Sequence, residues 1–209
     1  QFRLQKVNGV VETEVNYPLY FRNVAPEKLP AEGAKVHLWA TNLSQSINPA
    51  WVIILTPLIV AFFSFLRSRK KEPSTPTKIA FGLLISALSV LVMVAAVQIG
   101  HDGAEKVSAW WLVANYGIIT IGELFLSPMG LSVVSKLSPV NITSLMMGGW
   151  FLSTSIGNKL SGVLASMWDT YDNKANFFWV NFALLMFATV LMFGLVKQLN
   201  KVMKERGIN

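Results

Sequence analysis

The sequence contains no cysteine, which excludes a disulfide framework and a thiolate metal site. Its two histidines, His37 and His101, lie in polar segments without zinc-binding spacing. A phosphate-binding glycine loop and a serine nucleophile elbow are also absent. We therefore assign no catalytic residue and no metal ligand, and we expect neither a cofactor nor enzymatic activity.

Charged residues are scarce as well. They make up 14% of the sequence, whereas 53% is hydrophobic, and soluble domains usually carry about 25% charged residues. This composition indicates a lipid bilayer as the surroundings. The net charge of +7 then marks cytoplasmic loops rather than nucleic-acid binding. The chain starts at Gln1 without a signal-peptide pattern, so we expect a piece of a longer polypeptide.

Five apolar stretches follow residue 46, each about long enough to cross the bilayer core as a helix. Helices are favoured over strands because lipid satisfies no backbone polar groups and barrel-type alternation is absent. Residues 1–46 contain three prolines and scattered charges, which predicts an extracytoplasmic loop or insertion before a transmembrane domain of residues 47–209. The predicted spans are 47–66, 79–99, 108–134, 142–167 and 177–197.

Basic residues are distributed unevenly between the loops. The loops after the first and third spans, together with the C-terminal segment, contain ten lysines and arginines, and the other two loops contain two. By the positive-inside rule, the C-terminus is expected in the cytoplasm and residues 1–46 outside. The chain is therefore predicted to be a multi-pass protein of the cell membrane.

Glu123 lies well inside the third predicted span. An unpaired carboxylate in lipid is costly, so this side chain should face the bundle interior or a wet cavity. Either desolvation favours its neutral form or a cation keeps it ionised, and in both cases it can exchange a proton when its surroundings change. Such a group is a functional candidate, and a structural ion pair between helices is the alternative.

The residues after Glu123 suggest a bend in the same helix. Ser127 follows four positions later, on the same helical face. Pro128 cannot donate a hydrogen bond to the carbonyl of residue 124, so a kink is expected there. Gly122 and Gly130 flank this position. The pattern suits a gating hinge, although a static kink is also common in membrane helices.

Two further polar positions lie in predicted spans. Trp150 belongs to a stripe of Ser, Thr, Gly and Asn in the fourth span, where small residues often mark close helix packing. Its indole fits either core packing or a pocket wall with a hydrogen-bond donor. Asn48 opens the first span before Pro49, and it either caps that helix or turns its amide toward a cavity.

The stretch Gly122-Glu-Leu-Phe-Leu-Ser-Pro-Met-Gly-Leu-Ser132 resembles the tenth-helix signature of the proton-dependent oligopeptide transporter family of the major facilitator superfamily. Residues 45–49 (QSINP) resemble the start of helix eight, and residues 149–152 (GWFL) resemble helix eleven. The resemblance covers about residues 40–200. It implies an all-α membrane protein with five transmembrane helices of a major-facilitator-type C-terminal bundle, preceded by an external non-helical segment.

The resemblance also implies residue roles. Glu123 matches a glutamate that meets the amino terminus of the substrate, and Asn48 matches an asparagine that approaches the same group. Trp150 matches a tryptophan lining a side-chain pocket, and Ser127 matches a serine beside the glutamate. Helices ten and eleven of the family bend to open a cytoplasmic gate, in keeping with the predicted hinge.

The function implied is a proton-coupled symporter that imports di- and tripeptides by alternating access, with the proton as coupling ion. The family's early-helix motifs and a recognisable helix seven are missing, so the expected partners include an N-terminal helical bundle of the same protein, besides small peptides and lipid. Alternatives are a same-family transporter of a non-peptide solute such as nitrate, or a non-transporting membrane scaffold. An intramembrane enzyme would need a second catalytic group, and none is found.

Overall fold

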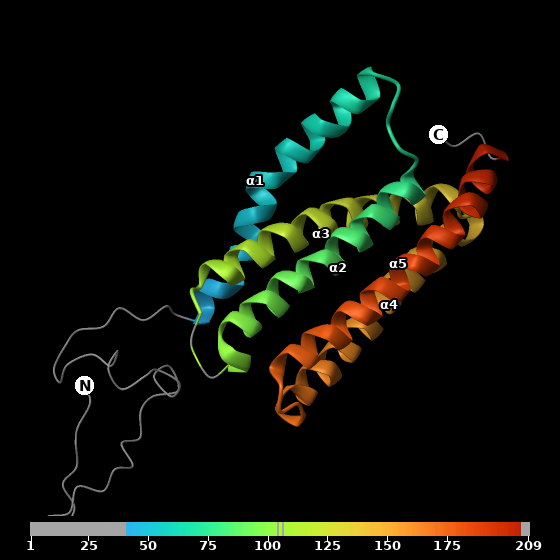
Figure 1. The fold of residues 1–209 in the computed structure, drawn as a ribbon. Helices are drawn as coiled ribbons and strands as arrows, with labels where there is room; N and C mark the ends of the chain where they lie inside the picture. The colour runs from blue at the N-terminus through green and yellow to red at the C-terminus, as the bar shows by residue number, and fades with distance from the viewer. Residues whose placement is uncertain (1–40, 104, 106, 206–209) are drawn as a thin grey trace, which may run out of the picture.

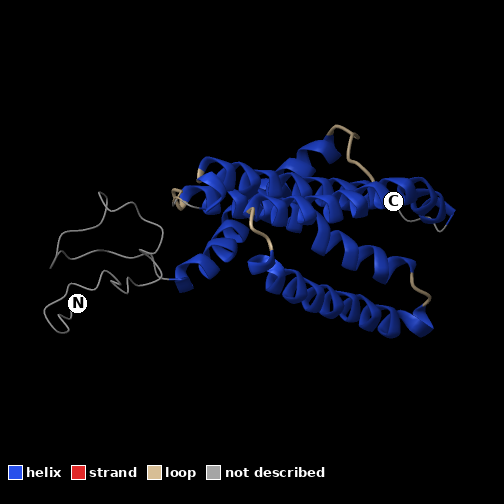
Figure 2. Cartoon of the chain, turned by 60° about the horizontal axis from the view of Figure 1, so that its bottom comes forward, coloured by secondary structure: helices blue, strands red, loops and turns tan. Residues whose placement is uncertain are grey.

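The computed structural model describes residues 41–103, 105 and 107–205 (Figure 1). Over these residues the chain forms helices joined by short loops, without any strand (Figure 2), which confirms the predicted all-α class. The five α-helices are α1 (Thr41–Ser68), α2 (Thr75–Ile99), α3 (Trp110–Leu137), α4 (Thr143–Ser166) and α5 (Lys174–Glu205). Three 3-10 turns occur in the connections: η3 (His101–Gly103), η4 (Val140–Ile142) and η5 (Met167–Thr170).

Helix α2 is the centre of the bundle and packs against both α3 and α5 (Figure 1). Its buried positions are mostly small residues, and small residues let helix backbones approach closely in a membrane. The contact with α3 is tightest at Gly82 and Gly122. A Cβ atom on Gly122 would lie 2.8 Å from the Gly82 carbonyl oxygen and 2.2 Å from Ser86 Oγ. This close approach sets the position of α3 relative to α2.

Helices α1 and α4 are far less enclosed. Helix α1 leans away from the other helices toward its C-terminal end (Figure 1) and makes its main helix contact with α3. Helix α4 has no buried residue, and it contacts α3. Both present large apolar side chains, such as Ile53 of α1 and Phe151 of α4, on their exposed surfaces. These surfaces therefore require lipid or further helices to cover them.

Four of the described helices, α1, α2, α3 and α5, are long and apolar enough to cross a membrane. The remaining predicted span, 142–167, does form helix α4, and its 24 residues would extend about 36 Å at 1.5 Å per residue. Its composition is more polar than that of the other four, because the serines, threonines and Lys159 of its polar stripe interrupt the apolar run.

The helix predicted to begin at residue 47 begins earlier. Helix α1 begins at Thr41, so residues 41–46 are helical and are not part of a non-helical segment. Hydropathy missed this turn because its residues are largely polar, and polar residues do not stop a helix that extends beyond the lipid core. The rest of the predicted external insertion, residues 1–40, lies outside the described residues.

Glu72 connects the end of α1 to the start of α2. Its carboxylate accepts hydrogen bonds from Arg67 Nε at 2.7 Å and from Lys78 Nζ at 2.5 Å. Lys78 is only 5% exposed, and its ammonium lies 4.4 Å from the ring centroid of Phe63. The Phe63 ring in turn packs on that of Phe125 in α3, with centroids 4.9 Å apart. This cluster links α1, α2 and α3 at the end of the bundle that carries the loop between α1 and α2.

The two cations lower the pKa of Glu72 to about 2, mainly through the hydrogen bonds from Arg67 and Lys78. Because the folded pKa lies below the unfolded value of about 4.3, the ionised carboxylate stabilises the fold above that value and loses its effect as pH falls toward 2. We expect Glu72→Gln to lower the thermal unfolding midpoint at pH 7. The difference in midpoint between the variant and the wild type should shrink as the pH falls from about 4.3 toward 2. Scanning fluorimetry in detergent would measure it, with Glu205→Gln as a control for an exposed carboxylate. A gap that stays constant down to pH 2 would contradict this account.

Candidate functional site

Helices α1 and α3 bring together two polar residues that are 75 positions apart in the sequence. Asn48 Nδ2 donates a hydrogen bond to Glu123 Oε2 at 3.1 Å. Thr120 lies beside them: it is fully buried, its hydroxyl donates to the Tyr116 carbonyl at 2.6 Å, and it lies 3.5 Å from Asn48 Oδ1. Because a carboxylate only accepts hydrogen bonds, the NH2 side of the Asn48 amide is the side directed toward Glu123. The capping role considered for Asn48 does not apply, because α1 already begins at Thr41; its role at a cavity remains a prediction.

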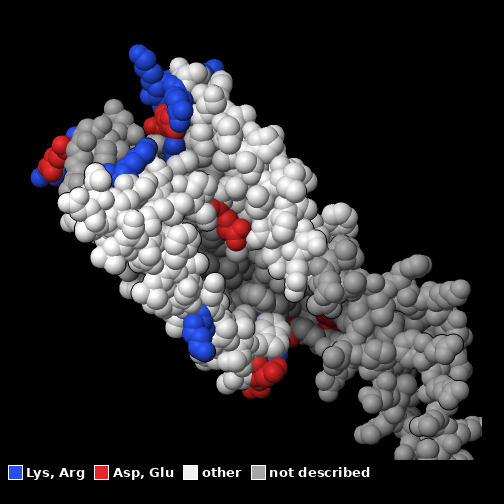
Figure 3. Space-filling view, turned by 180° about the vertical axis from the view of Figure 1, so that it is seen from behind, with Lys and Arg blue, Asp and Glu red and all other residues white. Residues whose placement is uncertain are grey.

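The Glu123 side chain is exposed and forms no ion pair with any of the described residues. The structural ion pair considered for this residue is therefore not made within this part of the chain. The view from behind in Figure 3 shows charged side chains gathered at the ends of the bundle and acidic atoms in a hollow at mid-height, surrounded by uncharged surface. A carboxylate in this setting can receive a cationic group from a solute.

Trp51 fixes how α1 crosses α3, and this crossing brings Asn48 within hydrogen-bond distance of Glu123. Its indole Nε1 donates to the Val113 carbonyl of α3 at 3.0 Å. The indole ring lies against Gly117, where a Cβ atom would be 3.1 Å from Trp51 Cε2. Trp51 is three residues after Asn48, nearly one helical turn, so it positions Asn48 against α3. Sequence reasoning assigned no site role to Trp51 or to Thr120, although Thr120 lies three residues before Glu123 on its helical face.

Trp150 contacts α3 at a different level from Glu123. Its ring occupies the space above Gly130, where a Cβ atom would lie only 2.2 Å from Trp150 Cη2. Gly130 is seven residues after Glu123, about 10 Å along the helix. The packing role considered for Trp150 is therefore present, and its role in a side-chain pocket remains a prediction.

The residues of the predicted hinge lie in one continuous helix. Helix α3 runs through Pro128 without interruption, and both Ser127 and Pro128 are exposed. Gly122 and Gly130 are buried, and each lies at a tight contact, with α2 and with Trp150 respectively. The glycines thus have a packing function, and bending at Pro128 remains a prediction.

A bundle of membrane-spanning helices with a carboxylate in a hollow at mid-helix defines a polytopic membrane protein of the transporter type. The chain belongs to the POT family, whose sequence profile matches residues 37–180. This confirms the family indicated by the signature around Glu123.

Similar proteins agree with this assignment. The chain is 34% identical over 132 residues to dipeptide and tripeptide permease A of Proteus mirabilis, covering 63% of this chain and 26% of the permease. It is 36% identical over 129 residues to dipeptide and tripeptide permease A of Escherichia coli, covering 62% and 25%. It is 30% identical over 161 residues to the uncharacterised transporter YclF of Bacillus subtilis, covering 77% and 31%. The chain thus spans about a quarter to a third of the length of these relatives.

Solved structures show the same fold. A POT family transporter crystallised with a thioalcohol-conjugated peptide superposes with a TM-score of 0.68 at 26% identity, over 86% of this chain and 36% of that one. A peptide transporter crystallised with sulfate superposes with a TM-score of 0.66 at 31% identity, over 76% and 31%. The arrangement of helices is therefore that of one part of such transporters, which places the chain in a membrane.

Proposed function

We propose that this chain is a C-terminal part of a proton-coupled symporter that imports di- and tripeptides by alternating access. The observation that carries the proposal is the exposed Glu123 carboxylate, held by a hydrogen bond from Asn48 within a POT family fold. The names of the relatives, dipeptide and tripeptide permeases, support small peptides as the substrates.

Glu123 would receive the ammonium group at the amino terminus of the peptide. A charge-assisted hydrogen bond between carboxylate and ammonium is about twice as strong as a neutral one. Asn48 would keep the carboxylate oriented, and Ser127 would offer a hydroxyl one turn away. Because the carboxylate can take up a proton or pair with an ammonium, proton binding and substrate binding are linked at this position.

The remaining parts of the proposal concern the whole protein. An N-terminal helical bundle would cover the exposed apolar surfaces of α1 and α4 and complete the cavity between two halves. Bending of α3 at Pro128, with Gly122 and Gly130 nearby, would open and close the cytoplasmic gate. The excess of lysine and arginine after α1 and α3 and at the end of α5 supports a cytoplasmic C-terminus.

The experiment is uptake by the native full-length polypeptide in liposomes with an inward proton gradient. We expect a labelled dipeptide to accumulate, unlabelled di- and tripeptides to compete, and an ionophore that collapses the gradient to stop accumulation. Uptake of nitrate without peptide uptake would instead show a same-family transporter of another solute. A folded protein that transports neither solute would be in line with a scaffold, and both results would refute peptide transport.

A further inference from the structure

The crossing of α1 and α3 depends on few contacts. Among residues 44–68 of α1 only Phe63 is buried, and its ring packs on Phe125, two residues beyond Glu123 in α3. On the other side of Glu123, nearer the start of α3, the contact is made by Trp51, which hydrogen-bonds the backbone of α3 and packs on Gly117. A helix with so few buried side chains can shift when one of them is removed.

The glycine at position 117 makes the contact with Trp51 possible. In a helix, a side chain lies over the preceding turn, toward the carbonyl four residues earlier. Because Gly117 has no side chain, the Val113 carbonyl is open on this side, and its second lone pair can accept the indole N–H at 3.0 Å. The ring lies on the uncovered backbone, with three of its atoms 3.1 to 3.4 Å from the position of a Cβ on Gly117. Trp51 and Gly117 therefore fit each other as a knob fits a hole.

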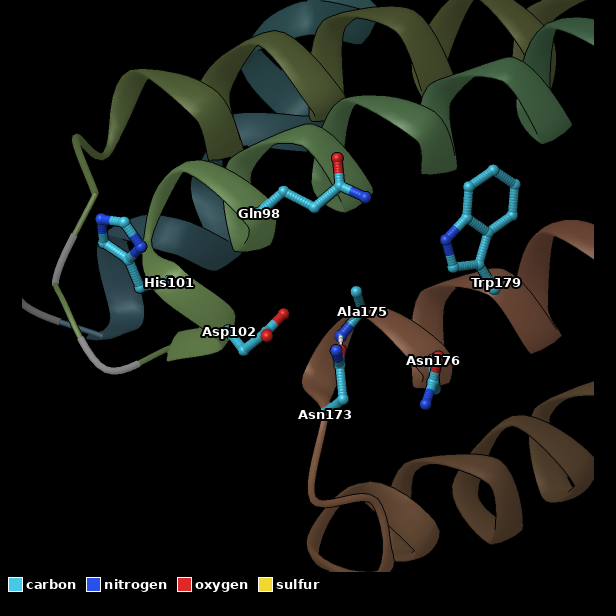
Figure 4. Close-up of a pocket in the computed structure, with 7 residues that line it drawn as sticks. All are labelled: Gln98, His101, Asp102, Asn173, Ala175, Asn176 and Trp179. Atoms are coloured by element: carbon cyan, nitrogen blue, oxygen red, sulfur yellow. Dashed lines mark hydrogen bonds between the residues drawn. The ribbon is translucent and has the colours of Figure 1, made fainter.

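A second indole at the same end of the bundle lies in different surroundings. Trp179 of α5 lines a polar cavity of about 460 Å³ between the end of α2 and the start of α5 (Figure 4). It is 45% exposed, and none of the residues that line this cavity comes from α1 or α3. Trp179 is therefore the same side chain in a place from which it cannot influence how α1 crosses α3.

The link from Trp51 to the candidate site is Asn48. The two residues are three positions apart on α1, so they project from neighbouring parts of one helical face. With the indole seated on α3, Asn48 Nδ2 lies 3.1 Å from Glu123 Oε2. A displacement of α1 by about 0.5 Å would already lengthen this distance beyond the range of a hydrogen bond. The orientation of the carboxylate thus depends on a contact that lies outside the site.

We propose that Trp51 is a positioning residue for recognition of the peptide amino group: seated on Gly117, it holds Asn48 where its amide orients the Glu123 carboxylate. The inference rests on the proposed function, which supplies the amino group as the ligand of Glu123. Losing an interaction that serves only to bind substrate raises KM and leaves the maximal rate unchanged. Trp51 therefore controls the affinity for the peptide and not the rate at which the bound peptide is carried.

The test is the KM and the maximal rate of dipeptide uptake by the full-length protein in proteoliposomes, with the maximal rate expressed per folded transporter. Trp51→Leu should raise KM about three- to tenfold, the range that one lost hydrogen bond predicts. Trp51→Phe, which keeps a ring but removes the N–H, and Gly117→Ala, which crowds the ring, should raise KM by less and replace Trp51→Leu if it does not fold. Trp179→Leu is the matched control, and its KM should stay within a factor of about two of wild type.

A double-mutant cycle shows whether Trp51 acts through Asn48. Asn48→Ala alone should raise KM, and adding Trp51→Leu to it should raise KM no further, because the amide that Trp51 positions is already absent. A residue that only stabilises the fold would lower the amount of folded protein and leave KM as it is. An unchanged KM in Trp51→Leu and Trp51→Phe, or an equal further increase in the Asn48→Ala background, would overturn the proposal and leave peptide transport by the wild type untouched.

The same dependence can be measured without a substrate. The thermal unfolding midpoints of Asn48→Ala, Glu123→Ala and the double variant give the coupling between these two side chains. We expect this coupling in the wild-type background and its loss in the Trp51→Leu or Trp51→Phe background. If the wild type takes up no peptide, the proposed function fails. Loss of the coupling would then still support the positioning role of Trp51, and a coupling that persists would refute that role as well.

Discussion

Glu123→Gln is expected to reduce gradient-driven dipeptide uptake by about 100-fold. Glutamine has nearly the shape of glutamate, but it carries neither the charge that attracts an ammonium group nor a proton to exchange. A hydrogen bond to a charged group contributes about 1.5–3 kcal/mol, which corresponds to roughly 10- to 150-fold in binding. Initial rates of labelled dipeptide uptake in proteoliposomes would measure the loss.

Two further variants make this experiment specific to the site. Glu105→Gln makes the same chemical change in the connection between α2 and α3, and uptake should stay within a factor of about two of wild type because exposed charges usually contribute little. Glu123→Asp keeps the charge but shortens the side chain that Asn48 contacts, so an intermediate rate is expected. If Glu123→Gln transports peptide at the wild-type rate, the assigned role of Glu123 is wrong, whatever the protein carries.

Gly122→Ala is expected to destabilise the bundle by about 3 kcal/mol, the upper part of the range for overpacking a well-packed contact. The added methyl would lie 2.2 Å from Ser86 Oγ, 2.8 Å from the Gly82 carbonyl oxygen and 3.1 Å from the Ser86 backbone nitrogen. Rotation of the Ser86 side chain can relieve only the first of these contacts. Helices α2 and α3 must therefore move apart, and their small-residue packing is lost. The thermal unfolding midpoint in detergent should fall by several degrees.

Gly148→Ala is the matched control, since a Cβ atom on Gly148 meets no other atom within 4 Å and the residue is helical. Alanine has the higher helix propensity, so this variant should be as stable as wild type or more stable. Adding Ser86→Ala to Gly122→Ala should restore part of the loss by removing the nearest clashing atom. Equal midpoints for Gly122→Ala and Gly148→Ala would show that the α2–α3 contact is looser than described.

Hydropathy was enough to predict where the helices lie, because lipid dictates long apolar runs whatever the tertiary structure. Hydropathy was less reliable for helical residues that lie outside the lipid core and for a helix with a polar face. Residues 41–46 are polar and helical, since a helix that leaves the lipid core needs no apolar residues. Helix α4 was predicted as a span like the others, but its polar stripe gives it a lower hydropathy than the four spanning helices.

The site was predictable only in part. An intramembrane carboxylate is unusual enough to be found in a sequence by itself, and Glu123 was found in this way. Its partnership with Asn48 depends on how α1 crosses α3, and local sequence does not determine a contact across 75 residues. Trp51 fixes that crossing and Thr120 lies beside the Asn48 amide, yet neither residue is unusual for a membrane helix. From the sequence, Gly122 and Gly130 suggested a flexible helix. A sequence alone does not show whether a glycine allows a helix to bend or allows another helix or side chain to pack closely against it.

The positions of these two glycines have a consequence for movement. Gly122, which receives α2, precedes Pro128, and Gly130, which receives Trp150 of α4, follows it. Pro128 therefore separates the part of α3 that contains Gly122 and packs on α2 from the part that contains Gly130 and packs on α4. A change of angle at this residue would carry α4 along with the second segment while both glycine contacts stay intact. The unit that moves would then be a helix pair, and the Glu123 carboxylate would stay with the stationary part.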